Sequence, residues 1–128
     1  MLFLYKTEVI EIHKKLITEF GGIHGLRDEG ALESALASAK NRAYYENADI
    51  AICAATYAYH LTQAHAFIDG NKRIAAAISE IFLEINDVKL NATNEQIVDL
   101  FLSIASGEKS RKDIEQIFFQ RMFHMIAQ

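Results

Sequence analysis

Apolar residues recur at helical spacing along most of this chain, and no proline interrupts them in 128 residues. Proline breaks helix interiors because it lacks a backbone donor, so a chain without it can form one helix after another. Apolar side chains three and four residues apart share one helical face, whereas a half-buried strand needs strict alternation. Just over half of the residues are hydrophobic, which is enough for a core without disulfides or metals. The sequence therefore predicts a compact all-α fold, with residues 1–128 forming a single domain.

Periodicity and capping residues together predict six helices with short connections. The expected helices cover about 7–20, 28–39, 49–64, 71–85, 93–105 and 110–125. Asp28, Thr93 and Ser110 are suitable N-caps, since their side-chain oxygens can accept from free amides at a helix start. The stretch 40–48 is expected to be an irregular loop or a small hairpin, and 88–90 a short extended segment. The helices at 49–64 and 71–85 are the most apolar and are predicted to be central.

Composition also narrows the class of protein. The formal net charge of −4 argues against a DNA-binding protein with a broad basic face. No stretch is long and apolar enough to cross a bilayer, and the single cysteine, Cys53, cannot form an internal disulfide. We therefore expect a cytoplasmic protein that binds neither DNA nor membranes directly.

The junction between the two central helices has a charge arrangement that local rules disfavour. Lys72 and Arg73 fall in the first turn of a helix, where the helix dipole favours anions. Asp69-Gly70-Asn71 has turn chemistry, and Asn71 is expected to be the N-cap. Free amides at a helix start, a glycine that permits close approach and two cations together form a typical phosphate-binding site. A bound anion would most simply offset the positive charges of Lys72, Arg73 and the helix dipole.

Two further residues complete a possible catalytic set. His65, at the end of the preceding helix, can face the same pocket, and an imidazole is well suited to act as a general base near neutral pH. Asp69 offers a hard oxygen of the kind that Mg²⁺ prefers, and Phe67 is expected to anchor the loop in the core. The same residue types also fit an ordinary solvated turn after a helix. The residues alone leave both interpretations open.

The order of residues in this segment resembles a known family motif. The chain reads His65-Ala66-Phe67-Ile68-Asp69-Gly70-Asn71-Lys72-Arg73. It resembles the Fic/Doc motif, which in Doc-type (death-on-curing) toxins of toxin–antitoxin modules reads His-x-Phe-x-Asp/Asn-Ala/Gly-Asn-Lys-Arg. The stretch 25–35 is similar to the Gly-x-Arg-Asp-x-Gly-x-Leu-Glu-Ser-Ala segment of Doc-like chains. The resemblance implies a six-helix Fic/Doc fold with the active-site loop between the two central helices.

The resemblance also implies a role for each motif residue. His65 would activate the acceptor hydroxyl, Asp69 would hold Mg²⁺, and the phosphates of ATP would be bound by Gly70, Asn71, Lys72 and Arg73. AMP-transferring relatives instead read His-Pro-Phe-x-x-Gly-Asn-Gly-Arg-x-x-Arg. Ala66, Lys72 and Ala76 depart from that pattern. A Doc-like chain is thus implied to move the γ-phosphate, although Ile74 stands where Doc chains commonly have threonine.

By the same resemblance, the acceptor would be a threonine of translation elongation factor Tu, and its modification would arrest translation and growth. The self-inhibitory Ser/Thr-x-x-x-Glu-Gly/Asn pattern of some Fic proteins is not found in this sequence. A Phd-like antitoxin acting in trans is therefore expected, in a bacterial or phage-encoded pair. Two alternatives stay open: an AMP transferase with the same fold, and a catalytically inactive binding module.

Overall fold

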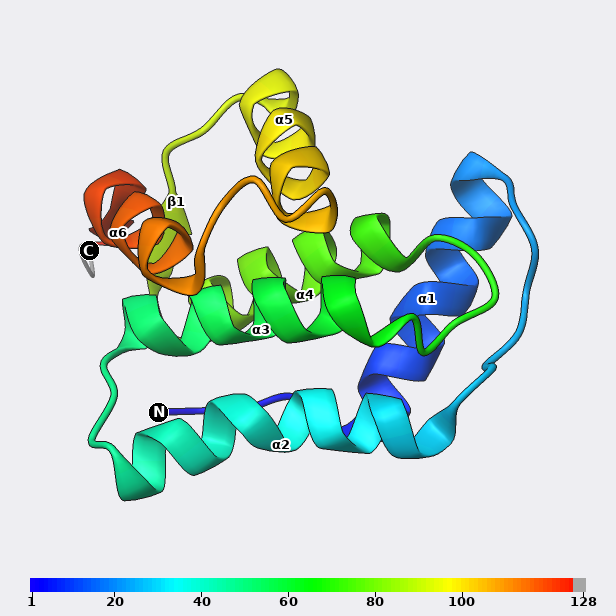
Figure 1. Ribbon diagram of the computed structural model, residues 1–128, viewed down its shortest axis with the longest axis horizontal. Coiled ribbons are helices and arrows are strands. Elements are labelled where there is room, and N and C mark those ends of the chain that lie inside the picture. Colours follow the sequence, from blue (N-terminus) through cyan, green and yellow to red (C-terminus); the bar gives the residue numbers. More distant parts are fainter. Residues whose placement is uncertain (126–128) are drawn as a thin grey trace.

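The computed structural model describes residues 1–125, which form six helices and two short strands (Figure 1). The elements are α1 (Lys6–Phe20), α2 (Glu29–Tyr45), α3 (Ile50–Ala64), α4 (Asn71–Ile85), β1 (Val88–Leu90), α5 (Asn94–Ala105), α6 (Arg111–Arg121) and β2 (Met122–His124). The expected all-α fold is confirmed. Within this described part of the chain, no helix is both long and apolar enough to cross a membrane.

Helices α3 and α4 form the centre of the molecule, and the other helices pack around them (Figure 1). Helix α3 contacts α2, α4, α5 and α6, as expected for a helix that is apolar on most sides. Four of its buried residues are alanines, which allow neighbouring backbones to approach closely. They are Ala51, Ala54, Ala55 and Ala58. Helix α1 crosses α4 near the end of α4 where the motif lies.

A cluster of aromatic rings connects the N-terminal segment to the two central helices. The Phe82 ring on α4 lies 5.0 Å from the Tyr57 ring on α3 and 5.7 Å from the Phe3 ring, measured between centroids. The Tyr57 hydroxyl accepts a hydrogen bond from the backbone N–H of Leu4 at 3.4 Å. Burial raises the pKa of Tyr57 to about 12, so this hydroxyl stays neutral.

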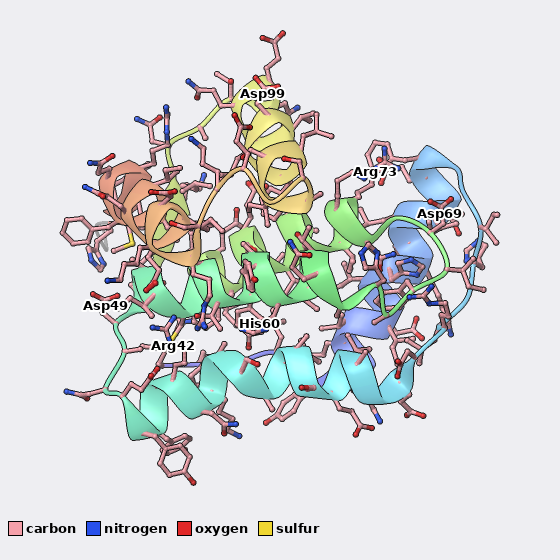
Figure 2. All side chains as sticks on the ribbon, in the orientation of Figure 1. Arg42, Asp49, His60, Asp69, Arg73 and Asp99 are labelled. Atoms are coloured by element: carbon pink, nitrogen blue, oxygen red, sulfur yellow. The ribbon has the colours of Figure 1, made fainter. Side chains whose placement is uncertain are left out.

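The loop or hairpin expected at 40–48 is wrong, because α2 continues to Tyr45. Arg42 supplies the physical reason, since its guanidinium connects three elements (Figure 2). Its Nε donates to Glu46 at 2.6 Å, and the same group reaches Thr56 on α3 at 3.1 Å and Glu115 on α6 at 3.4 Å. These contacts stabilise the last turn of the helix in a way that local periodicity does not reveal.

The expected continuation of the last helix to residue 125 is also wrong. Helix α6 ends at Arg121, and β2 pairs antiparallel with β1, with Lys89 opposite Phe123. Backbone hydrogen bonds extend the pairing on both sides, from Asn91 N to Arg121 O at 2.7 Å and from Met125 N to Asp87 O at 2.8 Å. The expected extended segment at 88–90 is confirmed. Without β2 the backbone of this segment would have an unpaired edge, and pairing with it explains why the chain after Arg121 leaves the helix.

Candidate active site

The motif forms the loop between α3 and α4, and two residues in left-handed conformation turn the chain there. His65 ends α3 with φ 48° and ψ 42°, and Gly70 precedes α4 with φ 76° and ψ 22°. Glycine adopts this region freely, whereas another residue pays about 1–2 kcal/mol. The backbone at His65 is therefore held in place by the rest of the loop, as is common at functional sites.

The connection between α1 and α2 runs beside this loop and pairs with it (Figure 1). The Ala66 carbonyl accepts from the backbone N–H of Arg27 at 2.7 Å and of Asp28 at 2.9 Å. The N–H of Ile68 donates to the Gly25 carbonyl at 3.0 Å. Gly25 is required here, because its φ is 136° and a Cβ would lie 2.7 Å from the Ile68 side chain. The two segments that resemble the family are thus in contact in the fold.

Asn71 has a different local role from the one expected. The predicted N-cap at Asn71 is wrong, because Gly70 occupies that position and Asn71 is the first residue of α4. The Asn71 side chain accepts from the Phe67 N–H at 3.0 Å and donates to the Phe67 carbonyl at 2.9 Å. A side-chain amide can satisfy one donor and one acceptor at once, so Asn71 holds the loop closed.

Asp69 projects from the loop towards the connection that follows α1 (Figure 2). Its Oδ2 accepts from the backbone N–H of Ile23 at 3.0 Å, and its Oδ1 accepts from the N–H of Gly70 at 2.8 Å. These two hydrogen bonds lower the pKa of Asp69 below its usual value, because they stabilise the carboxylate. Gly22 allows the approach, since a Cβ there would lie 2.7 Å from Oδ2.

The N-terminus of α4 carries two cations, and the Asp69 carboxylate just before the helix offsets part of their charge. The helix has no acidic residue in its first turn and no side-chain cap. Its first backbone hydrogen bond runs from Ile74 N to Gly70 O at 2.9 Å, so the amides of residues 71–73 precede the ladder. Lys72 and Arg73 are exposed, and the Arg73 guanidinium lies 4.8 Å from the centroid of the Phe20 ring (Figure 2).

A cavity of about 330 Å³ opens at this helix end. It brings together four of the predicted site residues, namely Asp69, Gly70, Lys72 and Arg73. Helix α5 supplies the opposite wall with Ile97, Val98, Phe101 and Leu102, and Ala76 also contributes. His65 and Asn71 lie outside this lining set. The exposed His65 stands at the other end of the loop, and Asn71 supports the loop from within.

Sequence reasoning missed one residue beneath the loop, His13 on α1. Its ring stacks on that of Phe67, with centroids 3.8 Å apart and an interplanar angle of 14°. Both side chains are 2% exposed. The available signal was the spacing of His13 between Val9 and Ile17, which puts a polar ring on the buried face of α1.

Comparison with known proteins gives a consistent result. The pattern of the Fic/DOC family matches residues 3–83. Protein kinase doc of Escherichia phage P1 is 35% identical over 104 residues, which cover 80% of this chain and 82% of that protein. Toxin Doc of Mycolicibacterium smegmatis is 40% identical over 75 residues, which cover 57% of this chain and 58% of that protein. The chain therefore belongs to the Fic/DOC family. It is similar to Doc toxins, as its motif predicted.

Proposed function

We propose that this protein is a Doc-like toxin that transfers the γ-phosphate of ATP to a hydroxyl of a protein target, a threonine of translation elongation factor Tu. The observation that carries the proposal is the positive start of α4, where Lys72, Arg73 and the ionised Asp69 line one cavity. Its similarity to protein kinase doc supports the reaction class. Modification of an elongation factor would arrest translation and growth.

The start of α4 would bind the phosphates. Lys72 and Arg73 line one cavity, and their backbone amides precede the helix ladder, so amides and cationic side chains together suit an anion with several oxygens. Gly70 lines the same cavity, and its positive φ lets the chain turn into α4 there. Transfer of a phosphoryl group depends mainly on such positioning and charge neutralisation.

Asp69 suits a Mg²⁺ ion that accompanies the nucleotide. Each carboxylate oxygen accepts one backbone N–H, which leaves further lone pairs, and the lowered pKa keeps the group charged. A magnesium ion needs only one or two protein carboxylates when it also binds phosphates. When bound, it would neutralise charge on the transferring group.

His65 would accept the proton of the attacking hydroxyl. The hydroxyl oxygen forms the new bond to the γ-phosphorus while the bond from the γ-phosphorus to the β–γ bridging oxygen breaks, and ADP leaves. The imidazole is exposed and projects from a fixed backbone position at the end of α3, so a protein substrate can reach it. A general base of this kind contributes about 10²- to 10⁴-fold to the rate.

Lys72 favours transfer of the γ-phosphate over transfer of AMP. AMP-transferring relatives have glycine at this position, where loop amides wrap the phosphates, and a lysine side chain competes for that space. Ala76, which lines the cavity, stands at the position where those enzymes have their second arginine. These two departures support a different placement of the nucleotide.

Labelled ATP tests the reaction directly. The purified protein is incubated with elongation factor Tu and ATP labelled at either the α- or the γ-phosphate, and we expect label on the factor only from the γ position. Lys72→Ala should reduce transfer about 10-fold or more, since a charge-assisted hydrogen bond contributes about 1.5–3 kcal/mol. The exposed Lys112 on α6 provides the matched control, and Lys112→Ala should transfer normally. Label from the α position would instead establish AMP transfer. Absence of label from both positions, on the factor and on every protein of a cell lysate, would indicate an inactive binding module.

A Phd-like antitoxin would inhibit the protein by covering the same cavity. Val98 and Leu102 on α5 are 57% and 51% exposed beside the cations, so the cavity offers an apolar wall next to a positive end. An amphipathic antitoxin helix with acidic residues fits that combination. The toxin expressed alone should stop growth, and co-expression of an adjoining antitoxin gene should restore it. Leu102→Asp should weaken rescue by the antitoxin, and full rescue of this variant would exclude the α5 wall as its binding site.

A further inference from the structure

The imidazole of His13 lies directly beneath the motif loop. It belongs to the buried face of α1, together with Val9 and Ile17, and is only 2% exposed. A buried polar ring needs hydrogen-bond partners, because an unsatisfied donor or acceptor costs about 1–3 kcal/mol. The partner that His13 contacts is part of the loop and not of its own helix.

The Nε2 atom of His13 lies 2.8 Å from the carbonyl oxygen of Asp69. A carbonyl oxygen can only accept, so Nε2 carries the hydrogen and donates it. The ring also stacks on Phe67, and a Cβ built on Gly70 would lie 3.6 Å from Nε2. His13 therefore contacts the loop at two motif positions, Phe67 and Asp69.

The carbonyl of Asp69 and the N–H of Gly70 belong to one planar peptide and point in opposite directions. When His13 holds the carbonyl inward, the Gly70 N–H is directed outward, where it donates to Asp69 Oδ1 at 2.8 Å. Because glycine adopts positive and negative φ with equal ease, the residue at 70 does little to oppose rotation of this peptide. The orientation must come from a contact such as the one made by His13.

We propose that His13 is a positioning residue that fixes the peptide between Asp69 and Gly70 and thereby prepares the site for phosphate. This inference rests on the proposed nucleotide-dependent function. If the peptide turned over, the Gly70 N–H would point inward and the Asp69 carbonyl would point towards the cavity. A carbonyl oxygen would then stand where an anion requires donors, and the Asp69 carboxylate would lose one of its two hydrogen bonds.

A pair of substitutions separates the hydrogen bond from the stacking. His13→Phe keeps an aromatic ring against Phe67 but has no donor, whereas His13→Gln keeps an N–H donor near the position of Nε2 but loses the ring. We expect His13→Phe to weaken binding of Mg²⁺·ATP roughly 5- to 100-fold, the range for an unsatisfied buried carbonyl. His13→Gln should restore most of that affinity. Calorimetric titration with Mg²⁺·ATP gives the affinities, and thermal unfolding shows whether each variant is folded.

Hydrogen exchange of the Gly70 amide provides a readout that needs no nucleotide. His13→Phe should change the exchange rate of this amide, because the N–H leaves its hydrogen bond to Asp69 Oδ1 and turns inward, and His13→Gln should return the rate to that of the unmodified protein. If His13→Phe does not fold, His13→Leu serves in the same comparison. Unchanged Gly70 exchange in the donor-free variant, or equal defects in the glutamine and phenylalanine variants, would reject the positioning role. If the unmodified protein binds no nucleotide while Gly70 exchange follows the expected pattern, the proposed function fails and the positioning role stands.

Discussion

Replacement of His65 by alanine is expected to reduce phosphate transfer to the protein target by about 10²- to 10⁴-fold, which is the usual contribution of a general base. The folded protein should change little in stability, because the side chain is exposed at the end of α3. His65→Asn is a useful second variant, since asparagine tolerates the left-handed backbone at this position better than alanine does. Both variants should therefore fold and both should fail to arrest growth.

Transfer rates from γ-labelled ATP, together with growth on induction, measure this effect. His124→Ala is the matched control, because His124 is an exposed histidine on β2, far along the chain from the motif. It should transfer phosphate and arrest growth like the unmodified protein. Growth arrest by His65→Ala at undiminished strength would show that His65 does not act as the base. Binding of Mg²⁺·ATP should persist in both His65 variants, because His65 lies outside the set of residues that line the cavity.

Phe82→Ala should have the largest effect on stability, a loss of about 3–5 kcal/mol in the free energy of unfolding. Phe82 is fully buried on α4, between the rings of Phe3 and Tyr57. Its removal leaves a cavity where the N-terminal segment meets both central helices. A domain is stable by only about 5–15 kcal/mol in total, so such a loss could unfold much of the population at growth temperature.

Urea unfolding followed by circular dichroism measures this loss. Phe119→Ala is the matched control, because it makes the same substitution at a side chain that is 64% exposed on α6. That change should stay within about 0.5 kcal/mol. Similar losses in the two variants would mean that the aromatic cluster around Phe82 does not support the core.

Much of this fold follows from local patterns. Helices α1, α3, α4 and α5 lie where apolar spacing predicts them, because residues three and four apart share the face that packs against the core. Thr93 and Ser110 form the caps that their position predicts, accepting from the N–H groups of Gln96 and Asp113 at 3.1 Å each. The motif loop could also be located from the sequence. Its turn residues are followed by two cations at the positive end of a helix dipole, an unfavourable arrangement that indicates a bound anion.

Contacts between distant segments decided the rest. Arg42 stabilises the last turn of α2 through hydrogen bonds to α3 and α6. The chain after Arg121 leaves its helix because it pairs with β1. Asn71 is a residue type that often caps helices. In the fold its side-chain amide instead bonds the backbone of Phe67, because the loop places a donor and an acceptor there. The sequence marks His13 only as a residue on the buried face of α1, and its hydrogen bond to the Asp69 carbonyl appears only in the fold. Local sequence sets which residues become helical, but the partner of a buried polar group depends on which segments the fold brings within hydrogen-bonding distance.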